Sequence, residues 1–334
     1  MALLLAADIG GTKANLWLYE LHAGRRDTRA EASLPSADFA DAQSMLAVFA
    51  RGARVDAAAV AIAAPVIAAR AAPPNLPWIV EQAAIADALG TPRVELLNDL
   101  AATAIGIDAL APDRLHTLNA GQHRTGPVVL IAAGTGLGEA AIIDDGGRRI
   151  VLPTEGGHAD FAPGSAEDIA LLQYLSARHP HVSWERVVSG PGLAAIHAFI
   201  LEREHGRDER PADLRDEQGD PAAAITRLAL IDRDAAAVAA LDMFVRLYGA
   251  EAGNLALKFL ATGGVYVAGG IAPKILAHLD GGRFMQGFVA KGRHADLMAG
   301  IPVHVVLEPK TALLGAARRA EALASAAAIP GPRA

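Results

Sequence analysis

The sequence predicts an α/β fold of two similar lobes, built from a strand–turn–strand unit that the chain uses twice. Apolar runs of strand length alternate with segments of helical spacing, which is typical of an α/β sheet. Residues 3–18 (LLLAADIGGTKANLWL) and 128–143 (VVLIAAGTGLGEAAII) share an apolar run, a turn of glycine and threonine, and a second apolar run. Only the first copy has an acidic residue before its turn, Asp8, where the second has Ile131. Two facing lobes with one acidic turn predict a single active site in the cleft between them.

The expected elements define the domain organisation. Strands are expected at residues 3–7, 14–21, 57–62, 94–97, 265–268 and 302–307. Helices are expected at residues 38–51, 79–89, 100–107, 169–177 (after a capping box of Ser165 and Asp168), 193–204, 221–230, 235–260 and 311–324. We expect a small lobe over residues 1–108, on which a C-terminal helix near 309–325 packs back, and a large lobe over 109–308. A hinge near 106–112 and a loose tail over 326–334 complete the expected organisation.

Composition and charge exclude several classes of function. The 334 residues are 52% hydrophobic and 20% charged, which is typical of a globular protein. The net charge is −7 and no long basic run occurs, which argues against a nucleic-acid groove. The absence of cysteine excludes disulfides and Cys-ligated zinc and fits a reducing compartment. Because the apolar N-terminus lacks a basic region and no apolar run reaches membrane-spanning length, we expect a soluble, cytoplasmic protein.

The first glycine turn (Gly10, Gly11 and Thr12) follows a predicted strand that ends near Asp8. Glycines let successive backbone N–H groups approach an anion, and an aspartate at a strand end can hold Mg²⁺ through water. Alone, the same segment also fits a plain hairpin.

Two further glycine turns follow predicted strands. Residues 134–138 (GTGLG) are neither a Walker loop, which needs a following Gly-Lys-Ser/Thr, nor a Rossmann fingerprint, which needs a following helix. Two related turns, one of them acidic, indicate a clamp on a polyphosphate. Gly269 and Gly270 precede Pro273, the expected first turn of a helix, and fit either the floor beneath a flat base or close helix–strand packing.

Asn98 and Asp99 stand where a strand ends and a helix begins. Both residue types are preferred helix caps. However, ligands of α/β proteins bind at the carboxyl edge of the sheet, and transfer of a phosphoryl group to an alcohol needs a carboxylate to accept the proton. Asp99 is therefore a candidate general base.

A polar loop follows the second predicted unit. Glu155 and His158 flank two glycines, and Asp160 comes next. Carboxylates and imidazole form charge-assisted hydrogen bonds to hydroxyl groups, so the loop predicts a polyhydroxy ligand. A metal site of Glu155, His158 and Asp160 is the second interpretation, although its spacing matches no helix-borne zinc motif. Glu185, before a Ser-Gly-Pro-Gly segment, is a surface residue unless it joins this group.

Seven segments in this order and spacing resemble the bacterial glucokinase family, in the form without a zinc motif. They run from about Leu3 to Leu323 and read DIGGTKANL, LLNDLAA, AAGTGLGEA, LPTEGGHADFAP, ERVVSGPGL, GNLALKFLATGGVYVAGGI and TALLGAA. The resemblance implies an actin-like (ribonuclease H-like) fold and ATP-dependent phosphorylation of glucose at its 6-hydroxyl. It also implies Mg²⁺ as a cofactor and a homodimer.

The resemblance implies a role for each matching residue. Asp99 resembles the general base, with Asn98 beside it holding ring hydroxyls of glucose. The other residues that resemble glucose ligands are Glu155, His158, Glu185 and Asn75. The residues that resemble the phosphate loops are Asp8, Gly10, Gly11, Thr12 and Lys13 in the first and Gly134, Thr135 and Gly136 in the second. Gly269 and Gly270 resemble the floor of the adenosine site.

One departure and three alternatives accompany this resemblance. Lys13 and Asn15 make the first turn similar to that of a sister family of repressors, open reading frames and kinases, which usually carries a Cys-rich zinc motif. The first alternative is a kinase for another hexose or an amino sugar, which would share every phosphate motif. A sugar-responsive regulator would need a DNA-binding domain, for which the phosphate loop at Asp8 leaves no room. A non-enzymatic actin-like scaffold would not need Glu155, His158 and Glu185 in addition to Asp99.

Overall fold

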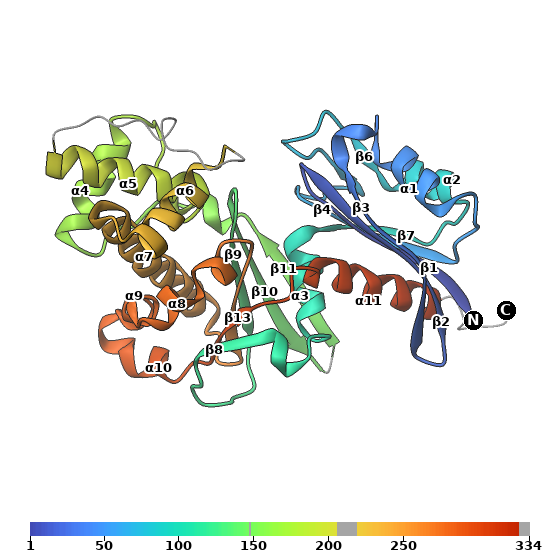
Figure 1. Cartoon of the computed structure of the whole chain (residues 1–334). Helices are drawn as coiled ribbons and strands as arrows, with labels where there is room; N and C mark the ends of the chain where they lie inside the picture. The colour runs from blue at the N-terminus through green and yellow to red at the C-terminus, as the bar shows by residue number, and fades with distance from the viewer. Residues whose placement is uncertain (147, 206–218, 327–334) are drawn as a thin grey trace. The chain divides into compact units, whose positions relative to one another are not determined.

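The computed structural model describes residues 1–146, 148–205 and 219–326 of the chain, which forms two compact units (Figure 1). Unit 1 comprises Met1–Pro112 and the segment from Glu308 onward, and unit 2 comprises Asp113–Leu307. Apart from Ala326, the expected tail over 326–334 lies outside the described residues. No helix of the described residues combines the length and apolar character that a membrane span requires.

Unit 1 is built on a five-stranded sheet in the order β3-β2-β1-β4-β7. Its strands are β1 (Ala2–Ile9), β2 (Lys13–His22), β3 (Arg25–Pro35), β4 (Ala57–Ile62) and β7 (Val94–Asn98). The first three pair antiparallel, whereas β1, β4 and β7 run parallel. Every residue of β4 is buried, as expected for a parallel strand covered on both faces.

Helices cover both faces of this sheet (Figure 1). Side chains that alternate along β1 point to opposite faces, so Leu5 joins one core cluster and Leu4 another. The first cluster includes side chains of α1 (Ala42–Ala50) and α2 (Gln82–Leu89). The second includes side chains of α3 (Asp99–Ile107) and α11 (Thr311–Ala326). Residues after position 307 thus complete the core of the N-terminal unit.

Unit 2 contains a six-stranded sheet in the order β11-β10-β9-β12-β13-β8. Its strands are β8 (Leu115–Asn119), β9 (Val128–Ala133), β10 (Leu137–Asp145), β11 (Arg148–Thr154), β12 (Gly264–Ala268) and β13 (Val303–Val306). Strands β9, β12 and β13 run parallel, and β10 and β11 extend the sheet antiparallel from β9. Apart from β8, this repeats the topology of unit 1, with β9 and β10 in the places of β1 and β2. The predicted double use of a strand–turn–strand unit is therefore confirmed.

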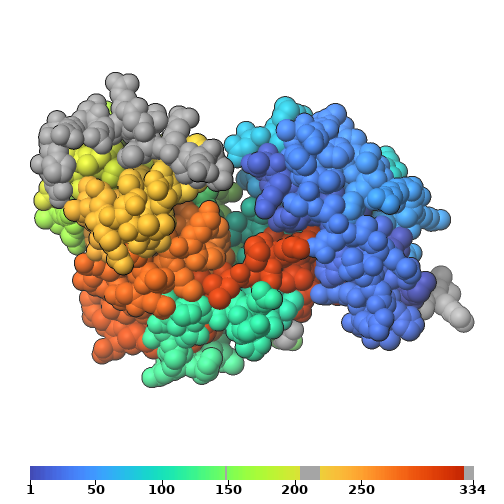
Figure 2. All heavy atoms as spheres, in the orientation of Figure 1, coloured from blue at the N-terminus to red at the C-terminus, as the bar shows by residue number. Residues whose placement is uncertain are grey.

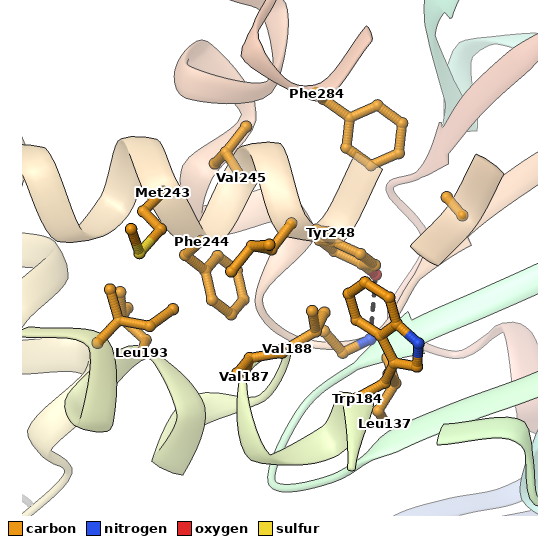
Figure 3. Close-up of a cluster of buried hydrophobic side chains, with 14 of the residues drawn as sticks. Leu137, Trp184, Val187, Val188, Leu193, Met243, Phe244, Val245, Tyr248 and Phe284 are labelled. Atoms are coloured by element: carbon orange, nitrogen blue, oxygen red, sulfur yellow. Dashed lines mark hydrogen bonds between the residues drawn. The ribbon is translucent and has the colours of Figure 1, made fainter. Parts of the chain in front are cut away.

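The core of unit 2 is formed largely between its sheet and its helices. The helices are α4 (Ala166–Ser176), α5 (Gly190–His205), α6 (Pro221–Arg227), α7 (Ala235–Phe259), α8 (Leu276–Asp280), α9 (Arg283–Val289) and α10 (Ala295–Ala299). Phe244 and Tyr248 of α7 pack against Trp184, Leu137 and Phe284 in a continuous apolar cluster (Figure 3). In the space-filling view, the gold surface of residues 221–232 adjoins the orange surface of the later helices of the same unit (Figure 2).

Some local expectations differ from the structure. The helix expected at 38–51 begins at Ala42, because the Asp41 carboxylate accepts the Ser44 N–H at 2.8 Å and caps it there. The helix expected at 79–89 begins at Gln82, because the preceding β6 (Val80–Glu81) pairs with β5 (Arg70–Ala71). Strands β3, β8 and β11 were not expected; the sequence of β3 is rich in charged residues. The predicted cap is confirmed: Ser165 Oγ accepts the Asp168 N–H at 3.1 Å.

The packing of α11 on α3 leaves no room for additional atoms. A Cβ atom at Gly315 would overlap the carbonyl oxygen of Ala102, and one at Gly106 would overlap that of Thr311. We therefore expect Gly315→Ala to lower the free energy of unfolding by about 1–3 kcal/mol, the usual cost of overpacking. Denaturant unfolding followed by circular dichroism measures this change.

The matched control adds one heavy atom at an exposed position of the same helix. Ala322→Ser should change the stability by less than about 0.5 kcal/mol. Equal stabilities of Gly315→Ala and the wild type would show that α11 does not pack on α3 this closely.

Candidate active site

The first glycine turn joins β1 to β2 in unit 1. The Gly10 N–H donates to the Lys13 carbonyl oxygen at 2.9 Å. Ser36 supports the turn from outside, because its N–H donates to Thr12 O at 3.0 Å and its hydroxyl to Gly10 O at 2.8 Å. Thr12 and Lys13 are exposed. The turn is thus held in shape by the protein while one side stays accessible to an anion.

Asp8 lies next to this turn, on the penultimate residue of β1. Burial raises the pKa of its carboxyl group, and the Asn15 amide, 3.5 Å away, and the charge of Lys13 oppose that rise. A cation beside Asp8 would favour the ionised form, and a carboxylate oxygen is a ligand type that Mg²⁺ prefers. The donor chemistry of Asp8 therefore fits the predicted magnesium ion.

Asn75 lies beside the first glycine turn. A Cβ atom at Gly11 would come within 2.7 Å of the Asn75 Cβ atom, so only glycine permits this approach. The Asn75 side chain is exposed. Within unit 1 the structure therefore brings Asn75 to the first glycine turn.

Asn98 and Asp99 lie at the junction of β7 and α3, as predicted. Asn98 Oδ1 accepts the N–H groups of Leu100 at 3.0 Å and Ala101 at 3.2 Å, and its amide donates to Ala64 O at 3.2 Å. Asn98 is thus the N-cap of α3, which confirms the structural interpretation of that residue. Asp99 Oδ1 accepts the Leu100 N–H at 2.9 Å, in the first turn where the helix dipole favours a negative charge.

The strand register places Asp8 and Asp99 at the same edge of the sheet. Asp8 is level with Ala61 of β4, and Ala61 is level with Leu97 of β7. The two acidic segments are therefore separated by two strand spacings, about 10 Å of backbone. In an α/β sheet this carboxyl edge is where ligands bind.

The second glycine turn joins β9 to β10 in unit 2 and forms hydrogen bonds with Gly190 and Glu185. The Gly134 N–H donates to Gly136 O at 2.8 Å, and Gly134 O accepts the Gly190 N–H at 2.8 Å. Glu185 Oε2 accepts the Leu137 N–H at 3.0 Å and lies so close to Gly136 that a Cβ atom there would collide with it. Glu185, predicted as a sugar ligand, therefore also holds the backbone of this turn.

A buried tyrosine lies behind the second glycine turn. The Tyr248 hydroxyl accepts the Ala133 N–H at 3.0 Å (Figure 3) and lies 3.2 Å from Ala268 O. Ala133 directly precedes Gly134, and Ala268 directly precedes Gly269, whose positive φ of 86° carries it closely past Ala133. Tyr248 thus ties together the two strand ends that carry the second and third glycine turns. Sequence reasoning missed it, because a tyrosine in a helical pattern gives no sign of such a contact.

Glu155 precedes the short 3-10 helix η3 (Gly156–His158), which His158 ends, and both side chains are well exposed. Their carboxylate oxygen and Nε2 atoms lie 3.9 Å apart. Gly157 lies against the carbonyl oxygen of Leu137, whose N–H group Glu185 binds. The backbone of the loop that carries Glu155 and His158 therefore contacts the residue whose N–H group Glu185 binds.

The metal interpretation fails at Asp160. Its carboxylate lies 2.9 Å from His181 Nε2, and its backbone forms a bridge with Ser183. In the described ranges, no three His, Cys, Asp or Glu side chains are grouped so that they could hold a metal ion. Glu155, His158 and Asp160 do not form the zinc-type site that was the second interpretation.

Glu139 is a second residue that sequence reasoning missed. It lies on β10, three positions after Gly136, and is only 1% exposed. Its carboxylate lies directly against Gly156, below the loop that carries Glu155 and His158. The signal available in the sequence was a charged residue inside an otherwise apolar strand.

Known proteins resemble this chain along nearly its whole length. A family model described as Glucokinase matches residues 5–323. The glucokinase of Trichormus variabilis is 42% identical over 336 residues, which cover 95% of this chain and 98% of that protein. The crystal structure of a glucokinase from an Antarctic psychrotroph is 29% identical, with a TM-score of 0.83 over 96% of this chain and 99% of that one.

A more distant structure shows a likeness in fold alone. It is a ROK family glucokinase from Streptomyces griseus in complex with glucose and AMPPNP, with 21% identity and a TM-score of 0.63 over 96% of this chain and 99% of that one. Together with the duplicated sheet topology, these matches confirm the predicted actin-like α/β fold. The family match, which covers all seven segments noted in the sequence, confirms the resemblance. The chain therefore belongs to the glucokinase family of enzymes.

Proposed function

We propose that the chain transfers the γ-phosphoryl group of ATP to the 6-hydroxyl of glucose. The observation that carries the proposal is the placement of Asp99 at the sheet edge that also bears Asp8 and the first glycine turn. A proton acceptor and a phosphate-binding turn at one edge are the parts that phosphoryl transfer to an alcohol requires. Relatives named glucokinase, and a glucokinase solved with glucose and AMPPNP, support the choice of substrates.

In this proposal, Asp99 accepts the proton of the 6-hydroxyl as the oxygen attacks the γ-phosphorus. The backbone N–H groups of the first and second glycine turns bind phosphate oxygens, and Gly269 and Gly270 lie under the adenosine. Asp8 would hold Mg²⁺ through water, and the ion would supply positive charge to the phosphates of the nucleotide. Asp99 and the first two glycine turns are held by hydrogen bonds with the backbone, so little reorganisation is needed during transfer.

Glucose is bound in this proposal by residues of both units. Asn98 and Asn75 of unit 1 hold hydroxyl groups near the reacting one, and Glu155, His158 and Glu185 of unit 2 hold the others. The proposal requires that both sets act on one sugar molecule. A homodimer in the cytoplasm is part of the proposal as well, on the family resemblance alone, and light scattering tests the dimer.

A coupled assay across sugars and phosphoryl donors tests the proposed function. We expect ATP with glucose to have the highest kcat/KM, with mannose, fructose, N-acetylglucosamine and N-acetylmannosamine lower. A higher kcat/KM for an amino sugar than for glucose would identify the amino sugar as the substrate. Polyphosphate as the better donor would refute the ATP assignment, and no transfer to any sugar would refute the kinase itself.

The role of Asp99 is tested by Asp99→Asn. The amide oxygen can still accept the Leu100 N–H, so we expect α3 and glucose affinity to be preserved. Without a general base, kcat should fall by roughly 10²–10⁴-fold. Turnover, glucose calorimetry and circular dichroism measure the three effects.

Asp87→Asn, the same change at an exposed position of α2, is the control and should leave kcat unchanged. Near-normal turnover in Asp99→Asn, or loss of the fold, would show that Asp99 is a helix residue without a catalytic role.

Alanine substitutions of Glu185 and Glu155 should differ in their effect on nucleotide affinity. Glu155→Ala and His158→Ala should weaken glucose binding alone. Glu185→Ala also leaves the Leu137 N–H without its partner and loosens the second glycine turn, so affinity for AMPPNP should fall too. The loss of a hydrogen bond to a charged group costs about 1–3 kcal/mol, roughly 5- to 150-fold in affinity.

Calorimetry with glucose and with AMPPNP separates these outcomes. Unchanged AMPPNP affinity in Glu185→Ala would refute the coupling through Leu137. Unchanged glucose affinity in all three variants would refute the assignment of the sugar ligands.

A further inference from the structure

The loop that carries the proposed sugar ligands rests on Glu139. We call residues 154–158 the sugar loop. Thr154 is the register partner of Glu139, its hydroxyl donates to Glu139 O at 3.3 Å, and it accepts the Gly156 N–H at 3.1 Å. On the side-chain face, the Glu139 carboxylate lies so close to Gly156 that any Cβ atom there would collide with it. Glu139 thus supports the sugar loop through both its main chain and its side chain.

The Glu139 carboxyl group is sealed from water. The residue is 1% exposed, and apart from the neighbouring Glu251 carboxyl group no hydrogen-bond partner of its oxygens occurs among the residues that the structure describes. An ionised carboxylate without hydrogen bonds is strongly disfavoured in such a place. On the loop side, Gly156 lies directly against this carboxyl group.

A second buried carboxylate lies behind Glu139. Glu251 of α7 is fully buried, and its oxygens accept from Asn254 at 2.8 Å and Lys258 at 3.4 Å. Lys291 donates to Ala250 O beside it. The other titratable groups around this pair are Tyr248 behind it and Glu155, His158 and Glu185 on the loop side.

Burial and the charge of Glu251 both favour the neutral form of Glu139. They raise its pKa to about 8, against the opposing charge of Lys258. Burial also raises the pKa of Glu251, but Asn254 and Lys258 stabilise its ionised form. Burial lowers the pKa of Lys291. At neutral pH Glu139 therefore carries the proton of this pair and donates it in a hydrogen bond to the Glu251 carboxylate.

We propose that Glu139 is a positioning residue for glucose, whose neutral carboxyl group supports Gly156 and keeps Glu155 and His158 in place. Ionisation of Glu139 requires hydration, which moves Gly156 and with it the sugar loop. Affinity for glucose then falls in alkaline solution, while the nucleotide turns are unaffected. This inference rests on the proposed function for its substrate but not for the movement of the loop.

Steady-state kinetics against pH test the effect on glucose. If the ionised form does not bind the sugar, the glucose KM of the wild type rises by up to roughly tenfold between pH 7 and 9, with the KM for ATP unchanged. Glu139→Gln keeps the shape without the charge, so its glucose KM should stay near the wild-type value at pH 7 and remain flat to pH 9. Glu251→Gln removes the repelling charge, so the rise should move to lower pH.

Glu167→Gln, the same change at an exposed position of α4, is the control and should keep the wild-type profile. An equal rise in Glu139→Gln, or a flat wild-type profile, would overturn the inference.

Hydrogen exchange of the sugar loop tests the movement without any sugar. After correction for the intrinsic pH dependence of exchange, the amides of residues 154–158 should lose protection above about pH 8 in the wild type and keep it in Glu139→Gln. Equal protection in both proteins would overturn the inference. If the loop responds but the protein phosphorylates no sugar, the proposed function fails and the role of Glu139 in the loop stands.

The stability of the sugar-free protein gives a further readout. A carboxyl group whose pKa is raised by folding destabilises the native state as the pH rises from its unfolded value, about 4.3, to its folded value of about 8. The melting temperature of Glu139→Gln relative to the wild type should therefore increase between pH 5 and pH 8 and then level off. A constant difference between the two proteins across this range would show that Glu139 is not held neutral by folding.

Discussion

Parallel pairing of β1, β4 and β7 in unit 1, and of β9, β12 and β13 in unit 2, is the constraint on which the candidate site depends. Parallel strands end at the same edge of a sheet. Residues that are far apart in the sequence are therefore placed at one edge, even where their side chains do not touch. In unit 1 this edge carries Asp8 and Asp99. In unit 2 it carries the second and third glycine turns. The duplicated topology therefore supplies an acidic edge and a glycine-rich edge from one structural plan.

The loops at these edges are kept in place by close approaches that exclude a side chain. Gly136 lies against the Glu185 carboxylate, and Gly156 lies against that of Glu139. Behind them, the Tyr248 hydroxyl joins the ends of β9 and β12. A loop fixed by its backbone in this way can present exposed groups to a ligand with little loss of entropy on binding. The buried Glu139 and the half-buried Glu185 thus both lie directly against glycines of these loops.

The sequence predicted the parts of this structure that depend on local pattern. Apolar runs ending in glycine turns revealed β1, β2, β9 and β10, and the repeat between them revealed the shared sheet topology. Strand β3 was missed because its stability comes from pairing with β2 rather than from its own charged residues. Tyr248, Glu139 and the bond from Leu137 to Glu185 were missed for a related reason. Each depends on a contact between segments that are distant in the sequence, and periodicity carries no information about such contacts.

In the proposed reaction, Asp99 acts on the same glucose molecule that Glu155, His158 and Glu185 bind. A crystal structure of the protein with glucose, Mg²⁺ and AMPPNP tests this proposal. We expect an Asp99 carboxylate oxygen within about 2.6–3.2 Å of the glucose 6-hydroxyl, the hydrogen-bonding reach of a general base. We also expect the other three side chains to bind the remaining hydroxyls of that sugar. Glucose bound by the residues of unit 2 with its 6-hydroxyl directed away from Asp99 would refute the proposed role of Asp99.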